Sequence, residues 1–396
     1  MNQTRPTIRI LPGHHKRVRT GHPWVYSNEI EMNAAAKALP PGTLVRVMTS
    51  HNEDLGTATF NPHNLIAARF LSREGDAIVD AGFLAEKLAR ALATRAALFP
   101  EPYYRLVHAE ADGLPGLIVD RFGDTLSVQT NTAGMEALAE PLRAALAEVL
   151  KPRSIILRND TGARAQEGLP LHTEVIGEAI EGPVTVVENG VRYRADLVGG
   201  QKTGWFYDQR DNRAFMARLS AGKRVLDAYT YLGGFGLAAA QAGAADVTCI
   251  DRSEPSLALA AQAAEENGLA ARCNFDRSEV FDRLDALGRA SEFFDVVICD
   301  PPAFVKAKKD FAAGIQGYRK LVRLAAPLVA PGGYLFIASC SHNVEAARFH
   351  DEVAQALHAA GRTGRILRTA GAAPDHPEHP LLPQSVYLKA LVFALD

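Results

Sequence analysis

The chain has 396 residues, of which 47% are hydrophobic and 22% are charged, and its formal net charge is −2. This length predicts two or three domains, each large enough to enclose its own core. The sequence contains no uninterrupted apolar run of about 18 residues, and residues 1–13 lack the apolar segment of a signal peptide. We therefore expect a globular protein of the cytoplasm.

The charge is distributed unevenly along the chain. Residues 1–70 carry eight Lys/Arg and four Asp/Glu, which gives +4, whereas the remainder carries 35 against 41, which gives −6. The N-terminal part is therefore the basic one, and it favours an anionic partner. Four excess charges are few for a sequence-independent nucleic-acid binder, so we expect all domains to share such binding.

Residues 1–72 alternate short strands and turns, as in 7–11, 43–48 and 65–70, a pattern that predicts a small β-barrel. A basic segment in this region offers phosphate ligands, among them Lys16 and Arg17. Trp24 and Tyr26 offer faces on which bases could stack. The alternative interpretation is a solvated basic loop beside two core aromatic residues.

Residues 73–187 predict a mixed α+β domain. We expect a long amphipathic helix over 77–99, a hairpin across Gly123-Asp124, a second helix over 135–150 and a strand at 154–157. An Asn189-Gly190 turn then predicts a further hairpin that leads into the last domain, 188–396.

From residue 208 onward, helical and strand patterns alternate, which predicts a twisted, largely parallel sheet. We expect Asn267-Gly268 and Pro331-Gly332-Gly333 to end the helices that precede two of its strands. The expected strands lie near 224–227, 246–250, 271–275, 293–299, 333–338, 364–370 and 386–393.

Residues 225–252 read as strand, glycine loop, helix and strand, which is typical of half of a nucleotide-cofactor site. Asp227 and Asp251 end the two strands, and three glycines, Gly233, Gly234 and Gly236, precede the alanine-rich helix. The glycines allow the backbone to approach a ligand closely. The same loop also fits the dinucleotide fingerprint G-x-G-x-x-A, so a dehydrogenase is an alternative.

Two later strands weigh against a dehydrogenase. One runs into Asp300-Pro-Pro-Ala-Phe304 and the other into Ser339-Cys-Ser-His342, so both motifs stand at carboxyl ends of parallel strands, where open α/β sheets place their chemistry. Hydride transfer needs neither a D-P-P corner nor a thiol at this edge. A class I S-adenosylmethionine methyltransferase that acts on a nucleic-acid base uses both.

The chain resembles the large-subunit ribosomal RNA methyltransferase I family. The resemblance rests on the segment 200–213, the D-x-Y-x-Y-x-G-G-F-G loop, and the motifs DRSEPSL, DPPAFVK and SCSH in this order, with further matches at 21–30, 157–160 and 167–168. It implies a PUA RNA-binding domain (1–72), a central α+β domain (73–187) and a Rossmann-like catalytic domain of seven strands (188–396). It also implies S-adenosylmethionine as cofactor and 5-methylcytosine in 23S rRNA as product.

Each part of S-adenosylmethionine requires a different kind of protein group. The three glycines suit the methionyl part, Asp227 the positive charge, and Asp251 the ribose hydroxyls. Glu279 suits the adenine amine, although an acid that complements the dipole of the next helix is an equal alternative. We also expect Asp300 to border the cofactor. By resemblance, a second wall of the site consists of Gln201, Lys202, Thr203 and Gly204.

Methylation of cytosine at carbon 5 requires a nucleophile that adds at carbon 6, and a thiolate suits this step. Cys340 follows a strand, whereas the other cysteines lie in or beside strands and read as buried apolar residues. These others are Cys249, Cys273 and Cys299. A thiol of ordinary pKa is only a few per cent ionised at pH 7, so we expect activation by the site.

Asp300 is expected to hold ring nitrogen 3 and the amino group of the cytosine. Pro301 and Pro302 stiffen the corner, Phe304 stacks on the base, and Lys306 meets phosphate. Wider 5-methylcytosine enzymes often carry a second cysteine where Pro302 stands here. The group that removes the carbon 5 proton is therefore left open.

Other interpretations remain at this stage. His376-Pro-Glu-His379 has metal-like spacing, but two histidines at this spacing outside a helix converge poorly, so we expect no metal. D-P-P-x-F is also close to the corner that grips an exocyclic amine, so methylation of an amine or of a guanine nitrogen is an alternative. A third is an RNA-binding assembly factor without turnover. The sequence leaves the oligomeric state open, a homodimer included.

Overall fold

The computed structural model describes residues 5–201 and 203–396, and its chain forms two compact units. The N-terminal unit comprises the residues up to Pro183 together with the segments Asp196–Trp205 and Pro374–Ser385. The C-terminal unit comprises Val184–Ala195, Phe206–Ala373 and Val386–Asp396. Within the described residues, no helix is both long and apolar enough to span a bilayer.

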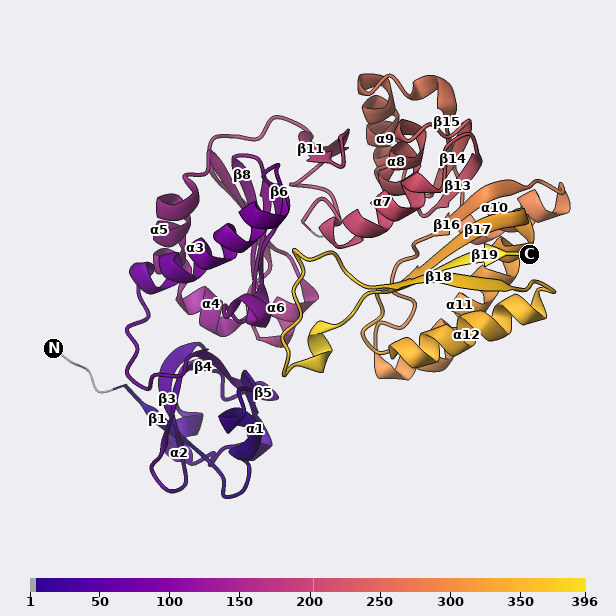
Figure 1. Cartoon of the computed structure of the whole chain (residues 1–396). Helices are drawn as coiled ribbons and strands as arrows, with labels where there is room; N and C mark the ends of the chain where they lie inside the picture. Colours follow the sequence, from indigo (N-terminus) through magenta and orange to yellow (C-terminus); the bar gives the residue numbers. More distant parts are fainter. Residues whose placement is uncertain (1–4, 202) are drawn as a thin grey trace. The chain divides into compact units, whose positions relative to one another are not determined.

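The N-terminal unit begins with a five-stranded sheet that curls around its own core (Figure 1). The strand order is β1-β3-β4-β5-β2, and buried residues such as Val45, Val47 and Phe60 fill the interior. The small β-barrel expected from the alternating pattern is thus present. Its elements are β1 (Thr7–Ile10), α1 (Lys16–Arg19), β2 (Trp24–Tyr26), α2 (Ala34–Lys37), β3 (Thr43–Thr49), β4 (Asp54–Phe60) and β5 (Ile66–Ser72).

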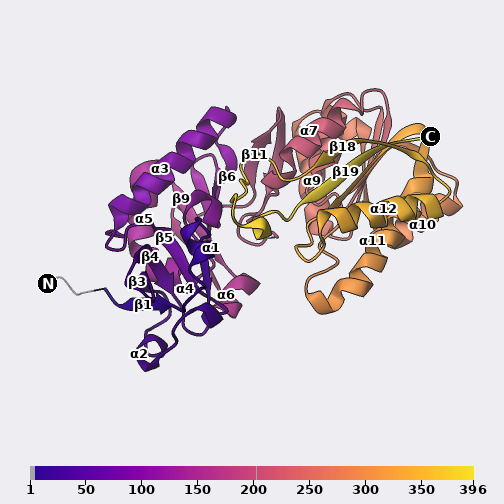
Figure 2. The same cartoon turned by 60° about the horizontal axis from the view of Figure 1, so that its bottom comes forward.

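A second core lies in the central part of the same unit. Its sheet has the order β10-β9-β8-β7-β6, and α3 lies beside α5 (Figure 2). The elements are α3 (Ala81–Leu98), β6 (Tyr103–His108), β7 (Leu117–Phe122), β8 (Thr125–Thr130), α4 (Ala133–Ala137), α5 (Ala139–Leu150), β9 (Ser154–Asn159), α6 (Gly162–Gln166) and β10 (His172–Gly177).

Two helix predictions in this region need correction. The first helix begins at Ala81 rather than at residue 77, because the Asp80 side chain caps it by accepting from Phe83 N. The second is two helices, which Leu138 separates. Pro141 has no N–H to donate to the carbonyl four residues earlier, so a continuous helix across this point would lose a hydrogen bond.

The C-terminal unit is built on a seven-stranded sheet of order β15-β14-β13-β16-β17-β19-β18, as expected. The first five strands are parallel, and β19 runs antiparallel to both of its neighbours. Its strands are β13 (Arg224–Ala228), β14 (Asp246–Asp251), β15 (Cys273–Arg277), β16 (Phe294–Cys299), β17 (Val329–Ser339), β18 (Gly364–Ala370) and β19 (Lys389–Leu395). The predicted hairpin before this sheet is β11 (Val184–Glu188) and β12 (Val191–Ala195).

Helices cover both faces of this sheet (Figure 1). One face packs against residues of α10, α11 and α12 in a single apolar core, and α7, α8 and α9 lie on the other side (Figure 2). The helices are α7 (Arg210–Arg218), α8 (Gly234–Gln241), α9 (Glu254–Glu266), α10 (Val280–Arg289), α11 (Phe311–Ala325) and α12 (Ala346–Ala359).

The glycine and proline signals in this unit were correct at one helix end and wrong at the other. Asn267-Gly268 ends α9, with Gly268 at φ 69°. Pro331-Gly332-Gly333, in contrast, lies inside β17, where the pairing with β16 shifts register. The α-helix α11 has already ended at Ala325, and a 3-10 turn that contains Pro327 follows.

Candidate active site

The carboxyl ends of β13, β14, β16 and β17 bring the predicted chemistry together in the C-terminal unit. These strands are parallel neighbours, and their register aligns the points at which they end. Four predicted site residues therefore stand along one edge of the sheet. They are Asp227, Asp251, Asp300 and Cys340.

The loop after β13 holds an unusual backbone conformation. Tyr229 and Tyr231 have positive φ angles of 65° and 53°, and Gly233 has 77°. Such angles cost free energy for residues that carry a Cβ, and they persist where surrounding contacts impose them. One such contact is the Tyr231 N–H, which donates to the Asp251 Oδ2 at 2.9 Å. The strained backbone of this loop therefore lies at the edge of the sheet that carries Asp227, Asp251 and Asp300.

Asp227 is fully buried below this loop. Its Oδ2 accepts from Thr230 Oγ1 at 2.5 Å and from Gly236 N at 2.7 Å. Its Oδ1 is buried and has no hydrogen-bond partner among the described residues. Burial raises the pKa of Asp227 to about 7. A buried carboxylate oxygen without a partner is the acceptor that a cationic ligand group requires.

Two of the three glycines lie elsewhere than the sequence interpretation placed them. Gly234 and Gly236 lie inside the first turn of α8 rather than before it. A Cβ at Gly236 would stand 2.4 Å from the Cys249 Sγ, and the Gly236 N–H is already bonded to Asp227. This glycine is therefore needed for close packing of helix on strand, and Gly233 supplies the left-handed residue before the helix.

Asp251 and Glu279 lie at the same edge. Asp251 is partly exposed, and its two oxygens accept from the backbone N–H groups of Tyr231 and Ser253, each at 2.9 Å. Glu279 is exposed at the start of α10, and its side chain makes no cap hydrogen bond. Burial raises the pKa of the Tyr229 phenol, and the charges of Glu279 and Asp251 act in the same direction.

Asp300 sits at the end of β16 and is oriented by a residue that the sequence interpretation missed. Gln209 donates from Nε2 to Asp300 Oδ1 at 2.9 Å, and Asn212 donates to Gln209 Oε1 at 2.7 Å. Burial, followed by the negative charge of Asp208, raises the pKa of Asp300 to about 7.

The rest of the D-P-P corner is partly internal. Pro301 is buried and Pro302 exposed. The Phe304 ring lies 4.8 Å from the Tyr318 ring and 6.0 Å from the Phe281 ring, between centroids, so much of its surface is used in protein packing. Lys306 is exposed, as a contact to phosphate requires.

Cys340 differs from the other cysteines. It is the one thiol with partial exposure, whereas Cys249, Cys273 and Cys299 are buried. Burial raises the pKa of all three buried thiols, that of Cys273 to about 11, which suppresses their ionisation at neutral pH.

The serines beside Cys340 form part of its support. Ser339 Oγ donates to Tyr318 Oη at 2.7 Å, and Tyr318 Oη and Ser341 Oγ are 2.8 Å apart. Ser341 Oγ also accepts from Val305 N at 3.1 Å, which ties the loop after Asp300 to the loop that carries Cys340. Because this hydroxyl cluster is buried, it holds the two loops in a fixed relation.

Comparison with known proteins decides the family. A model of S-adenosylmethionine-dependent methyltransferases matches residues 170–394, and a PUA-like domain model matches residues 8–73. The ribosomal RNA large subunit methyltransferase I of Aeromonas salmonicida is 37% identical over 390 residues, which cover 97% of this chain and 98% of that protein. The protein of the same name from Shewanella amazonensis is also 37% identical, with the same coverage.

The chain belongs to the ribosomal RNA large subunit methyltransferase I family.

Solved structures agree on the fold. A methyltransferase crystallised with SAH has a TM-score of 0.84 and 21% sequence identity, and the match covers 98% of this chain and 99% of that one. A SAM-dependent methyltransferase from Streptococcus mutans has a TM-score of 0.81 at the same identity. The predicted arrangement of a PUA-like domain, a central domain and a Rossmann-like methyltransferase domain is confirmed as a fold.

The cofactor of a methyltransferase of this family is S-adenosylmethionine, and the residues present fit it. The unpartnered oxygen of Asp227 is a buried acceptor for a cationic group, and Asp251 presents a partly exposed carboxylate for hydroxyls. The predicted second wall, Gln201 to Gly204, belongs to the N-terminal unit, and Lys202 lies outside the described residues. There Thr203 Oγ1 donates to Asp120 Oδ2 at 2.5 Å.

In the PUA-like domain of the methyltransferase, Trp24 has structural contacts. Its Nε1 donates to Glu110 Oε1 at 2.7 Å, and the Arg69 guanidinium carbon lies 5.3 Å from its ring centroid. Trp24 is only partly buried, and these contacts hold its ring in place. Lys16 is exposed, as expected of a phosphate ligand.

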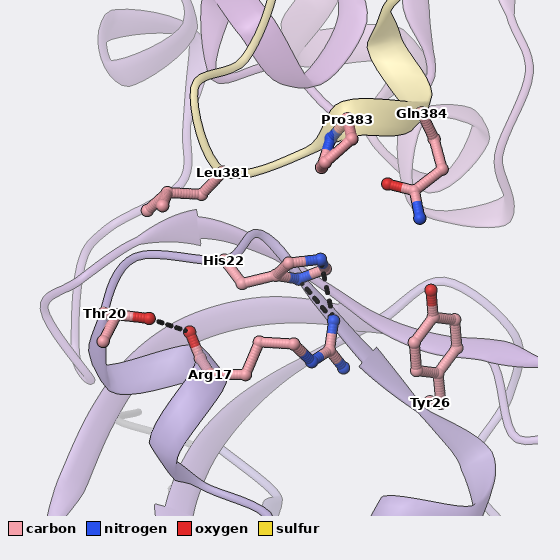
Figure 3. Close-up of a pocket in the computed structure, with 7 residues that line it drawn as sticks. All are labelled: Arg17, Thr20, His22, Tyr26, Leu381, Pro383 and Gln384. Atoms are coloured by element: carbon pink, nitrogen blue, oxygen red, sulfur yellow. Dashed lines mark hydrogen bonds between the residues drawn. The ribbon is translucent and has the colours of Figure 1, made fainter. Parts of the chain in front are cut away.

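Arg17 lines a pocket of about 380 Å³ that the sequence interpretation missed (Figure 3). One side comes from α1, β2 and the turn between them, and the other comes from the segment Pro374–Ser385. Arg17 pairs with Glu29 at 2.6 Å and lies over the Tyr26 ring. The pocket is lined by Arg17, Thr20, His22, Tyr26, Leu381, Pro383 and Gln384.

His376, one of the two histidines whose spacing resembles that of metal ligands, has a partner within the protein. His376 Nδ1 lies 2.8 Å from Asp375 Oδ1, and both residues are buried. Asp375 Oδ2 accepts from Arg105 N at 3.0 Å, which binds this segment to β6. Asp375 is thus part of the framework of the N-terminal unit.

Proposed function

We propose that this methyltransferase forms 5-methylcytosine in 23S rRNA, with Cys340 as the nucleophile. The observation that carries the proposal is the position of Cys340, a partly exposed thiol that directly follows β17, next to the strand that Asp300 follows. The names of the relatives supply the large-subunit rRNA as the substrate class.

The proposed reaction begins with the thiolate. Carbon 5 of cytosine is a poor nucleophile, so the Cys340 thiolate first adds to carbon 6 and the electron pair of the 5,6 double bond moves into the ring. S-adenosylmethionine supplies the methyl group that carbon 5 takes. A base then removes the carbon 5 proton, the electron pair restores the double bond, and Cys340 leaves as the thiolate.

Asp300 is proposed to stabilise the ring during thiol addition. With a pKa of about 7, a large fraction of this carboxyl is protonated at neutral pH. Since Gln209 donates to Oδ1, the proton resides on Oδ2, and it can bond to ring nitrogen 3 of the cytosine. The protonated carboxyl of Asp300 then stabilises the negative charge that develops on this nitrogen.

The N-terminal unit is proposed to contact the RNA. Lys16 offers an exposed cation, and the pocket that contains Arg17 and Tyr26 offers a guanidinium beside an aromatic ring. These are the groups that bind phosphate and stack on unpaired bases.

A second candidate is methylation of an exocyclic amine or a ring nitrogen. The Asp300-Pro301-Pro302 corner supports it, because this corner also suits an amino group. Such a reaction forms no bond to carbon 6 and needs no thiol. Cys340 therefore separates the two candidates.

The decisive experiment uses 23S rRNA fragments that carry 5-fluorocytosine. Because fluorine does not leave as a proton does, the wild-type protein should remain covalently bound to this RNA after methyl transfer. Cys340→Ala should lose both adduct and turnover but still bind the cofactor, and Cys299→Ala should keep all three. If Cys340→Ala still makes 5-methylcytosine by mass spectrometry, the proposed nucleophile is wrong.

A further inference from the structure

Lys389 is an unusual residue for its position. It begins β19, a strand in the interior of the sheet, and it is only 8% exposed. A lysine is rarely buried, because its ammonium loses hydration that protein groups must replace. A buried lysine that no part of the proposed reaction uses therefore calls for a specific cause.

The partners of Lys389 lie on the loop that carries Cys340. Across the antiparallel pair of β17 and β19, Lys389 stands opposite Ser339, the residue before Cys340. Its Nζ donates to the carbonyl of Ser341 at 2.6 Å and to that of Val344 at 2.9 Å. Two of its three N–H groups thus hold the turn that follows the cysteine.

The charge of Lys389 acts on the same thiol. Burial lowers the pKa of Lys389 to about 8, and the negative charge of an ionised Cys340 opposes this shift. The amine is still mainly protonated at pH 7, so it presents a cation to the thiol. Of the other titratable groups nearby, Tyr318 also interacts with Cys340, and its pKa is raised by burial. His342 stacks on Tyr387 with 5.2 Å between the ring centroids.

We propose that Lys389 is a positioning residue for Cys340, which fixes the turn after the cysteine and stabilises its thiolate by charge. This inference rests on the proposed nucleophilic role of Cys340. A thiolate near a cation forms at lower pH than an ordinary thiol, whose pKa is about 8.5. Without the cation, this stabilisation of the thiolate would be lost.

The test measures the thiol directly in the full-length protein. The rate of alkylation of Cys340 by iodoacetamide is followed from pH 5.5 to 10 by mass spectrometry of the peptide that contains it. The other cysteines serve as slow internal references because they are buried. We expect an apparent pKa below 8 in the wild type and a value at least one unit higher in Lys389→Met.

Turnover provides the second measurement. Lys389→Met should reduce kcat at pH 7 about tenfold or more and recover part of it at pH 9, where the thiol ionises without help. Lys389→Arg keeps the charge and the donors, so it should retain most of the thiol shift. Lys320→Met removes an exposed lysine of α11 and should change neither quantity.

The outcomes separate this inference from the proposed function. Equal thiol pKa values in wild type and Lys389→Met would overturn the inference, even if Cys340 proves essential. A shifted thiol pKa together with an active Cys340→Ala would overturn the proposed nucleophile but leave the electrostatic contact standing. If circular dichroism shows that Lys389→Met does not fold, the wild type and Lys389→Arg still test the inference. An ordinary thiol pKa of Cys340 in both proteins would refute the charge effect.

Discussion

Gln209 donates its side-chain amide to Asp300, with 2.9 Å between Nε2 and Oδ1, and thereby orients this partly buried carboxyl, which follows β16. The hydrogen bond stabilises the ionised form of Asp300, which opposes the effect of burial on its pKa. A residue that lies 91 positions earlier in the chain thus orients the predicted base-binding group and opposes the rise in its pKa.

The first prediction concerns this hydrogen bond. Gln209→Leu should raise the pKa of Asp300 above 7 and lower kcat about tenfold, because the carboxyl loses its orientation. The pH profile of turnover should move toward higher pH on the limb that reports ionisation of Asp300. Gln241→Leu, at an exposed glutamine that ends α8, is the control. A pH profile identical to that of the wild type would contradict the role given to Gln209.

The second prediction concerns pH and the cofactor. The pKa of Asp227 is about 7 in the folded protein, above its ordinary value near 4. This group therefore contributes stability that is complete below about pH 4 and is lost as the pH rises through 7. A cationic ligand group favours the carboxylate, so its effect has the opposite sign.

Calorimetry should therefore show that S-adenosylmethionine binds more tightly as the pH rises from 5.5 to 7, approaching tenfold per pH unit at the acid end. Binding in this range should release a proton. Asp227→Asn should bind weakly and without this pH dependence. If the affinity of the wild type is constant over the range, Asp227 does not contact the positive charge.

The third prediction concerns RNA binding by the N-terminal unit. The double variant Lys16→Gln/Arg17→Gln should weaken binding of rRNA fragments and reduce the salt dependence of log K by about 2, one for each lost phosphate contact. Arg90→Gln changes an exposed arginine of α3 and should leave the slope unchanged. Cofactor affinity should be the same in all three proteins. An unaltered salt slope in the double variant would place the RNA elsewhere.

The fourth prediction concerns stability. Asp120 is fully buried and accepts two hydrogen bonds from Arg105, at 2.7 and 2.8 Å, and one from Thr203. Asp120→Ala removes the buried carboxylate of this ion pair from the Arg105 cation, so it should lower the free energy of unfolding by about 3–5 kcal/mol. Asp285→Ala removes only an exposed ion pair on α10 and should cost less than about 1 kcal/mol.

Urea unfolding followed by fluorescence can resolve this effect. The protein has two tryptophans, Trp24 and Trp205, and both belong to the N-terminal unit, as Asp120 does. The fluorescence transition should therefore move to lower urea in Asp120→Ala and stay in place in Asp285→Ala. Equal midpoints for the two variants would show that the buried pair adds little.

The sequence predicted those features that depend on local pattern. Apolar runs next to an acid located the strands that contain Asp227 and Asp251 and the strand that precedes Asp300, because side-chain periodicity is a local property. The position of Cys340 after a strand also separated it correctly from the buried cysteines. The family resemblance supplied the domain order.

Features that depend on contacts between distant residues were missed. Gln209, Tyr318 and Lys389 lie on different elements and meet the loops after β16 and β17 only when the sheet is assembled. No periodicity marks them, although a lysine within an apolar strand pattern was a signal that could have been read. The contribution of Gly236 was likewise hidden, since its close neighbour Cys249 belongs to the next strand.

The segment Pro374–Ser385 is made late by the ribosome but belongs to the unit that is made first. Arg95 donates to the Asp375 carbonyl at 3.0 Å, and Arg105 donates its backbone N–H to the Asp375 carboxylate. The helix α3 and the strand β6 therefore receive these two hydrogen bonds only near the end of translation. Domains usually fold in order as they emerge from the ribosome. Here the nascent N-terminal unit must wait, incomplete, until almost the whole polypeptide has been synthesised. A polypeptide that ends before Pro374 would lack a segment of each unit. Both incompletely folded units would therefore be exposed together to chaperones and proteases.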